Sequence, residues 1–156
     1  MALRTIVKFG EDILRKKCRP VTAFDEKLAE LLNDMAETMY EAQGVGLAAP
    51  QVGIIRRAVV IDVRDEHGLI ELVNPEIISQ SGSVTDNEGC LSDPDEFLPV
   101  ERPEEVTVKA FDRNGKEFTV TGSGLLARAF CHEIDHLDGI LFIDKAQRDE
   151  IPLQRS

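Results

Sequence analysis

Apolar residues near the start of the chain recur at helical spacing. Between residues 25 and 43 they fall three or four positions apart, and acidic residues stand near the beginning of the segment. This spacing puts the apolar side chains on one face, so it predicts an amphipathic helix. Gly44 follows directly, and we expect it to end the helix in a left-handed conformation. The apolar face would consist of Leu28, Leu31, Leu32, Met35, Met39 and Ala42.

The middle of the chain contains short segments that are rich in Val, Ile, Phe or Thr. They cover residues 58–63, 69–78, 106–111 and 118–121, and they predict β-strands. Asn114 and Gly115 predict a hairpin turn between the last two. A C-terminal helix is expected at residues 124–137, where Gly139 supplies the stop signal. Because the strands follow one another without alternating helices, we expect an α+β fold with mostly antiparallel β-sheets around the C-terminal helix.

Length and composition favour a single domain. The chain has 156 residues, of which 42% are hydrophobic and 30% charged, so it can build one core but has little material for a second. We therefore treat residues 1–156 as one domain. The 18 basic and 29 acidic residues leave a net charge of −11. This charge argues against direct binding to nucleic acid or to anionic membranes.

Nothing in the sequence predicts export or membrane insertion. No segment approaches the roughly 20 apolar residues of a membrane span, and charged residues interrupt the first nine positions too often for a signal peptide. The three cysteines, Cys18, Cys90 and Cys131, cannot all pair with one another, and a chain of this length does not need disulfides. We therefore expect free thiols and a cytoplasmic location.

The predicted C-terminal helix carries ionisable residues within an apolar stripe. His132 and His136 stand four positions apart and so share a helix face, while Glu133 lies about 100° around from His132. Unpaired, such groups would be costly to bury. A divalent metal removes this cost, because two neutral imidazoles can coordinate it and Glu133 can take a proton from a metal-bound water. The segment thus predicts a hydrolytic metal site.

A catalytic site of this kind needs a third protein ligand. The metzincin pattern is excluded because Phe142 stands where its third histidine would be. A thermolysin-like glutamate is disfavoured because only 20 residues follow His136 and they predict no clear second helix. Cys90, 42 residues before His132, is the best remaining candidate. Two alternatives stay open. One is a metallopeptidase of another lineage that shares the His-Glu-x-x-His (H-E-x-x-H) motif of residues 132–136 and uses a carboxylate or histidine as third ligand. The other is a structural zinc module with four ligands.

A run of small residues follows the first predicted helix. Residues 44–51 include Gly44, Gly46 and Gln51, and such small residues let a backbone lie close to another molecule. A phosphate-binding loop is excluded, because no Lys-Ser or Lys-Thr pair follows and the helix lies on the wrong side of the glycines. The segment instead predicts an edge that binds a peptide, with Gln51 able to donate an amide N–H to a developing oxyanion.

Taken together, three segments resemble the peptide deformylase family. They are residues 44–51, residues 88–92 with the sequence Glu-Gly-Cys-Leu-Ser, and residues 132–137, which contain the two histidines. They occur in the family's order and at its usual spacing. Similarity also covers residues 74–75, 102–103, 124–128 and 139–144, so that it extends over nearly the whole chain up to about Lys145.

The resemblance implies a specific reaction. Such an enzyme is a hydrolase that removes the formyl group from the N-terminal formyl-methionine of newly made polypeptides, during protein biosynthesis, and releases formate. Cys90, His132 and His136 would hold the metal. The metal would be Fe2+, although this set of ligands would also accept Zn2+, Ni2+ or Co2+. Glu133 would act as the general base.

The resemblance also implies which residues bind the substrate. The Leu91 backbone N–H and the Gln51 amide would stabilise the oxyanion, and an extended peptide would pair with the backbone near Gly46 as an added strand. The methionine pocket would be formed by Val45, Leu125 and Ala129. The implied partners are formyl-methionyl nascent peptides at the ribosome, and the implied state is a monomer.

A few positions depart from the family pattern. Asp93 replaces an apolar residue, and Cys131 replaces a common glutamine. Helix geometry should point Cys131 about 100° away from the neighbouring histidine, so we expect it not to be a ligand. If the acidic residues 93–96 border the cleft, they would favour Lys or Arg after the methionine. His67 is expected to be an exposed turn residue.

Overall fold

The computed structural model describes residues 2–146. Two long helices, α1 (Glu26–Glu41) and α2 (Leu125–Leu137), and two sheets make up most of the fold. Shorter elements are the 3-10 turns η1 (Asp12–Arg15) and η2 (Ala49–Val52) and the one-turn helix α3 (Phe142–Lys145). The strands are β1 (Gly46–Ala48), β2 (Ala58–Ile61), β3 (Ile70–Ser81), β4 (Val84–Cys90), β5 (Asp93–Arg102), β6 (Glu105–Phe111) and β7 (Glu117–Ser123).

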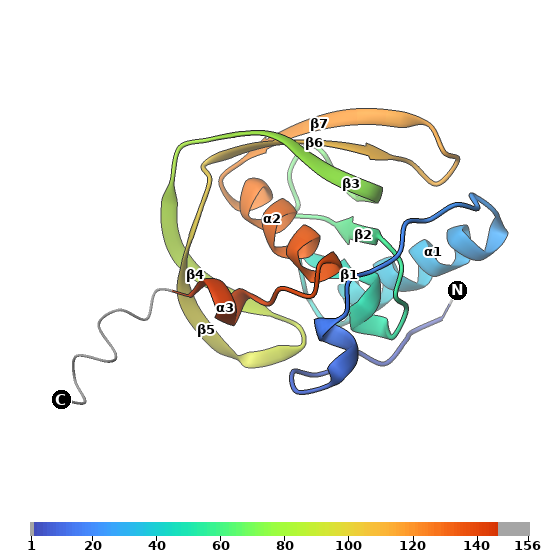
Figure 1. Cartoon of the computed structure of the whole chain (residues 1–156), viewed down its shortest axis with the longest axis horizontal. Helices are drawn as coiled ribbons and strands as arrows, with labels where there is room; N and C mark the ends of the chain where they lie inside the picture. Colours follow the sequence, from blue (N-terminus) through green and yellow to red (C-terminus); the bar gives the residue numbers. More distant parts are fainter. Residues whose placement is uncertain (1, 147–156) are drawn as a thin grey trace.

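Five strands form the larger sheet, in the order β1-β2-β3-β6-β7, and β4 pairs with β5 in a separate hairpin. Each neighbouring pair is antiparallel, so the predicted α+β fold with antiparallel sheets is confirmed. β3 leads almost directly into β4, and Figure 1 shows this ribbon bending round one side of α2. The β4–β5 hairpin therefore leaves the larger sheet and approaches α2 separately.

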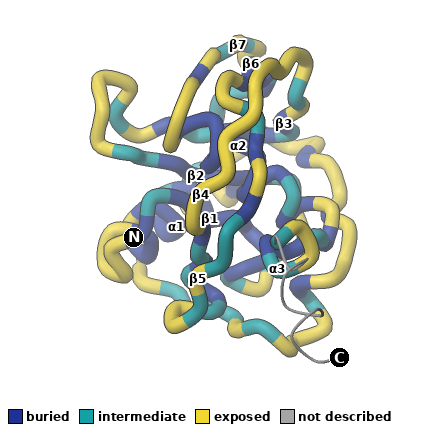
Figure 2. Tube along the Cα trace, turned by 90° about the vertical axis from the view of Figure 1, so that its left-hand side faces the viewer, coloured by how far each residue is buried: buried dark blue, intermediate teal, exposed yellow. Residues whose placement is uncertain are grey.

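The larger sheet separates the two long helices. Along β2, Val59 and Ile61 pack with the buried face of α2, whereas Ala58 and Val60 pack with α1. All four are fully buried, because successive side chains of a strand point to opposite faces. Figure 2 shows the buried residues gathered on the inner elements and the exposed ones along loops and the outer strand β7. The ionisable residues of α2 consequently lie in the interior.

The two helices have well-defined ends. At the start of α1, the Asp25 carboxylate accepts a hydrogen bond from the Leu28 N–H at 3.1 Å, which satisfies one of the free amides of the first turn. After α2, Gly139 takes a φ of +76°, and the following N–H, of Ile140, donates back to the Asp135 carbonyl. The expected stop signal at Gly139 is therefore present.

The expected role of Gly44 at the end of α1 is wrong. The left-handed residue is Gln43, with a φ of +61°. Its N–H donates to the Tyr40 carbonyl, and the Gly44 N–H donates to the Met39 carbonyl, which is the bonding pattern of a Schellman helix end. Gly44 serves packing instead, because a Cβ at this position would lie 2.6 Å from Leu91 Cδ1.

The predicted strands are present with changed ends. The segment 58–63 shortens to β2, and the other three lengthen to β3, β6 and β7. Gly115 takes a φ of +84° in the turn between β6 and β7, as its hairpin position requires. Strands β1, β4 and β5 were not predicted, since β1 is very short, β4 contains Asp, Asn and Gly, and β5 is rich in acidic residues and proline, all of which strands disfavour. None of the helices within residues 2–146 has the length and apolar character of a membrane span.

Candidate metal centre and active site

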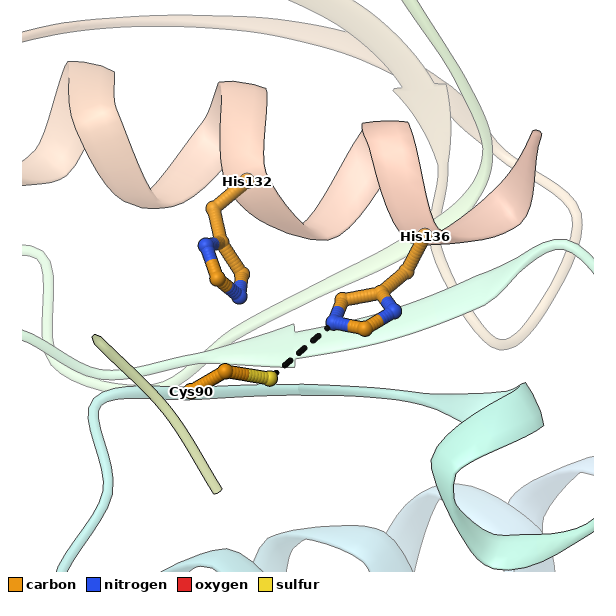
Figure 3. A group of neighbouring side chains, drawn as sticks. All are labelled: Cys90, His132 and His136. Carbon is orange, nitrogen blue, oxygen red and sulfur yellow. Dashed lines mark hydrogen bonds between the residues drawn. The ribbon is translucent and has the colours of Figure 1, made fainter. Parts of the chain in front are cut away.

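Helix α2 directs two buried histidines to the same place. The ring centroids of His132 and His136 are 5.1 Å apart, and Figure 3 shows both rings projecting from α2 toward Cys90 on the opposite side of the site. The Nε2 atom of His136 lies 3.3 Å from Cys90 Sγ. One ligand atom from each of the three residues lies within 4.8 Å of the others. The fold thus brings Cys90 to two histidines that are more than 40 residues away in sequence.

Cys90 reaches this position at the end of β4, where Leu91 and Ser92 form the tight turn to β5. The N-terminal segment holds the turn, because the Phe9 N–H donates to the Ser92 carbonyl at 2.9 Å. The Gln51 amide, which is 1% exposed, also contacts it: its Nε2 lies 3.1 Å from Ser92 Oγ and 3.5 Å from Cys90 Sγ. Gln51, Leu91 and Cys90 are therefore neighbours.

A buried carboxylate that sequence reasoning missed holds His132. Glu88 Oε2 lies 2.5 Å from His132 Nδ1. A carboxylate accepts, so Nδ1 carries a proton, and the neutral ring then has its lone pair on Nε2, where a metal would need it. Arg102 donates to both oxygens of Glu88, at 3.1 and 2.7 Å, and Arg128 donates to Oε1 at 2.9 Å. Burial alone raises the pKa of Glu88, but the hydrogen bonds from His132 and Arg102 outweigh it and lower the pKa to about 2.

One signal for Glu88 was present in the sequence. Glu88 and Cys90 are two residues apart, which is the spacing of side chains on one face of a strand. The signal was missed because β4 was not predicted. Arg102 and Arg128 offered no comparable signal, since one lies on β5 and the other on α2, and their meeting at Glu88 depends on how the hairpin approaches α2.

Glu133 supplies a second buried carboxylate beside the histidines. Burial raises the pKa of Glu133 to about 7. Its Oε1 atom has no hydrogen-bond partner among the described residues, and a Cβ on Gly46 would lie 2.6 Å from its Oε2. The carboxylate therefore packs against β1 with hydrogen-bonding capacity left over. A buried acid in this state is typical of a group that exchanges protons with a water or a substrate.

The donor set fits a divalent metal. Burial and the neighbouring His132 lower the pKa of His136 and keep this imidazole neutral. Burial also acts to lower the pKa of His132, but the charge of Glu133 and the bonds to Cys90 and Glu88 raise it well above its usual value. These groups thus attract a positive charge, which a cation bound by a thiolate and two imidazoles would provide in place of a proton. Three such ligands leave a fourth position open, as in catalytic sites.

A cavity of about 400 Å³ opens onto Cys90, His132 and Glu133. Its walls come from the α1–β1 loop, the β4–β5 hairpin and the first half of α2, and they include the four residues expected to bind the methionine or its backbone, Val45, Gly46, Leu125 and Ala129. Of the two expected oxyanion donors, Leu91 is in the described lining and Gln51 is not. Pro94 and Phe97 also line it, so the segment that contains the acidic residues 93–96 reaches the cavity. The preference for Lys or Arg stays a prediction. A larger hollow of about 760 Å³ beside the start of α1 has none of the predicted site residues among its described lining.

Two other candidate residues lie outside this site. Cys131 is buried in the core between α2 and the larger sheet. His67 is exposed in a turn, as expected, and its Nδ1 lies 3.1 Å from the Asp65 carboxylate. With Glu66 these two could offer ligand atoms to a cation, but exposed acidic groups of this kind are common without one. Burial therefore distinguishes the group formed by Cys90, His132 and His136 from this exposed group.

The site consists of a buried helix with two histidines and a glutamate, a thiol that faces them, and an adjoining cavity. This arrangement defines the site of a metal-dependent hydrolase. Comparison with known proteins gives the family. A family model described as polypeptide deformylase matches residues 3–151. The peptide deformylase of Caldicellulosiruptor bescii is 59% identical over 160 residues, which cover 100% of this chain and 95% of the relative. That of Acetivibrio thermocellus is 57% identical over 157 residues, covering 99% and 91%.

Solved structures agree with this result. The crystal structure of a peptide deformylase from Legionella pneumophila matches with a TM-score of 0.90 at 49% identity, covering 98% of this chain and 91% of that one. The Thermotoga maritima enzyme matches with a TM-score of 0.90 at 43% identity, covering 93% and 98%. This chain belongs to the polypeptide deformylase family, metal-dependent hydrolases that remove the formyl group from the N-terminal formyl-methionine of new polypeptides. The alternatives of an unrelated metallopeptidase and a structural zinc module are set aside.

Proposed function

We propose that this chain, acting as one catalytic domain over residues 1–156, deformylates peptides in the cavity above α2, with Cys90, His132 and His136 as the metal ligands. The observation that carries this assignment is the meeting of three buried donor atoms beside a buried carboxylate with an unused oxygen. The group contains a thiol and no carboxylate ligand, which matches the resemblance to deformylases and not to other H-E-x-x-H enzymes.

The native metal is proposed to be Fe2+. A divalent metal at this position supplies a Lewis acid that polarises the formyl carbonyl and lowers the pKa of water. The assignment to iron rests on the family, because a thiolate with two imidazoles also accepts Zn2+, Ni2+ or Co2+ and the affinity order alone does not favour iron. The metal found after purification therefore depends on how the protein is handled.

Glu133 is proposed to move the proton in the reaction. Its carboxylate takes a proton from the attacking water as the water oxygen bonds to the formyl carbon, and it passes that proton to the amine as the C–N bond breaks. The products are formate and a peptide with a free N-terminal methionine. Burial, which raises the pKa of Glu133, favours a carboxyl group that can hold the proton between the two steps.

Gln51 and Leu91 are proposed to stabilise the oxyanion. One N–H of the Gln51 amide donates to Ser92 Oγ, while the other faces Cys90 Sγ at 3.5 Å. The N–H that faces the sulfur lies beside Cys90, where it can turn toward a substrate oxygen. The backbone N–H of Leu91, the next residue in the turn, is the second donor.

The substrate is proposed to bind as an extended strand. β1 stands at the edge of the larger sheet, where β2 is its paired neighbour, so a peptide can add along Gly46 by backbone hydrogen bonds. The methionine side chain would lie between Val45, Leu125 and Ala129. Leu125 is 53% exposed although it is large and apolar, and a bound methionine would cover it.

The site of action is proposed to be the cytoplasm, where nascent peptides that carry formyl-methionine emerge from the ribosome. Processing would be co-translational, with the chain acting as a monomer. Its net charge of −11 supports a passing encounter with the peptide rather than direct binding to ribosomal RNA.

Formate release from formyl-Met-Ala-Ser under anaerobic conditions tests the proposal. We expect one formate for each free methionine amine that appears, and no cleavage of acetyl-Met-Ala-Ser, which serves as the control peptide. Cleavage of the Met-Ala bond in place of the formyl amide would contradict the proposal and indicate a peptidase.

A further inference from the structure

A cluster of three polar side chains lies beside the α1–β1 loop, residues 42–45, which lines the substrate cavity. Tyr40 belongs to the last turn of α1, and Asp62 and Arg64 follow β2. The Tyr40 hydroxyl donates to Asp62 Oδ2 at 2.6 Å, Asp62 Oδ1 accepts from the Arg64 N–H at 2.8 Å, and the Arg64 guanidinium lies 5.7 Å from the centroid of the Tyr40 ring. Each residue therefore contacts the other two. We call these three residues the Arg64 cluster.

The Arg64 cluster binds two consecutive backbone carbonyls of the loop. Arg64 Nη1 donates to the Gly44 carbonyl at 3.0 Å and to the Asp62 carbonyl at 2.8 Å. The Asp62 N–H donates to the Val45 carbonyl at 2.8 Å. Arg64 does this from a backbone φ of +62°, which disfavours a residue with a Cβ. A residue held in such a conformation by its contacts is a candidate for a functional role.

The opposite side of the same loop faces the catalytic residues at close distance. A Cβ on Gly44 would lie 2.6 Å from Leu91 Cδ1, and a Cβ on Gly46 would lie 2.6 Å from Glu133 Oε2. Gly44, Val45 and Gly46 all line the cavity. The loop is therefore held between the Arg64 cluster and the proposed catalytic residues, so a small shift of its backbone changes the edge to which a peptide would bind.

We infer that Arg64 is a positioning residue for substrate binding. By holding the Gly44 carbonyl, with Asp62 holding that of Val45, it keeps the edge strand β1 in place for an extended peptide. Arg64 is outside the described lining of the cavity, so it acts through the backbone and not by touching the substrate. This inference rests on the proposed function and adds to it the residue that orders the peptide-binding edge.

Steady-state kinetics with formyl-Met-Ala-Ser test the inference in two variants. Arg64→Ala removes the guanidinium and keeps an unfavourable φ, whereas Arg64→Gly removes the guanidinium and accepts that φ without cost. We expect KM to rise about three- to tenfold in both, with kcat within about twofold of the wild type, because the lost bond orders the bound and transition states equally. Amide hydrogen exchange in residues 44–48 should become faster in both.

Arg113→Ala is the matched control. The Arg113 guanidinium donates to Glu71 and Asn33, away from the cavity, so its loss should leave KM and exchange in residues 44–48 unchanged. Arg64→Lys keeps a donor and should recover part of the KM. The inference is overturned if KM in Arg64→Ala equals that of the control, if kcat falls while KM stays constant, or if Arg64→Gly restores the wild-type KM, since backbone strain would then explain the defect. A wild-type protein that releases no formate would instead contradict the proposed function.

Discussion

Glu88 Oε2 lies 2.5 Å from Nδ1 of His132, so the imidazole of a proposed metal ligand is oriented by a buried carboxylate. The same carboxylate binds Arg102, which also donates to Asp135 at 2.8 Å. With the bond from Arg128 to Glu88, a continuous chain of charged hydrogen bonds links the β4–β5 hairpin to three positions on α2. Burying a carboxylate costs solvation free energy, and the hydrogen bonds that compensate for this cost also fix the geometry of the site.

Replacing Glu88 with Gln tests whether this contact supports the metal. The substitution keeps the size of the side chain and removes the charged acceptor. We expect metal affinity to fall roughly 10- to 100-fold, as is typical when a partner of a ligating histidine is lost. Competition with a chelator measures the affinity. Glu71→Gln is the control, since Glu71 binds Arg113 away from the cavity. Equal affinities in the two variants would show that Glu88 does not prepare His132 for the metal.

Replacing Glu133 with Ala should separate metal binding from catalysis. Glu133 is not a proposed ligand, so the metal content should stay at the wild-type level. The rate of formate release should fall by about 10² to 10⁴, because the group that carries the proton is missing. Metal analysis and kinetics on the same preparation decide the matter. Loss of the metal together with the carboxylate, or near-normal turnover, would contradict the assigned role.

Replacing Cys90 with Ser should remove most of the bound metal, because a hydroxyl is a far weaker ligand than a thiolate. Cys131→Ser is the matched control. Burial raises the pKa of the Cys131 thiol, and its side chain packs in the core, so its loss should leave the metal content unchanged. The metal-to-protein ratio after anaerobic purification is the measurement. Retention of metal in Cys90→Ser would indicate a different third ligand.

Replacing Gly46 with Ala should disturb the general base without touching a ligand. The added Cβ would lie 2.6 Å from Glu133 Oε2, so the buried carboxylate has to move. Displacements of this order cost up to about 10²-fold in rate, and we expect a fall in kcat of about 10- to 100-fold. Metal content and thermal unfolding of the same variant serve as controls and should change little. A wild-type kcat would show that Glu133 works equally well from a shifted position.

Native enzyme should lose activity in air. Ferrous iron with a thiolate ligand exposes both the metal and the sulfur to oxidation. Activity measured after anaerobic purification should therefore correlate with iron content and decay on exposure to oxygen, while a sample kept anaerobic retains it. The iron assignment fails if native activity follows zinc content and is insensitive to oxygen.

The sequence by itself determined the features that depend on neighbouring residues. The apolar spacing of residues 25–43 and 124–137 was enough to predict α1 and α2, because a helix face is set by positions three and four apart. The same local geometry puts His132 and His136 on one face wherever the helix lies. Elimination of other third ligands left Cys90 as the best candidate, the resemblance of three short motifs implied the same residue, and the structure brings its sulfur to 3.3 Å from His136 Nε2.

Only the tertiary structure decided which distant groups surround these residues. Strands β4 and β5 were missed because the acidic residues of both strands and the prolines of β5 hide the strand pattern, and their stability comes from pairing with each other beside α2. Glu88 meets Arg102 and Arg128 across 14 and 40 residues of chain, and Arg64 reaches Gly44 across 20. Such contacts leave no periodic signal in the sequence, because a hydrogen bond depends on where the folded backbone brings its donor and acceptor and not on their separation along the chain.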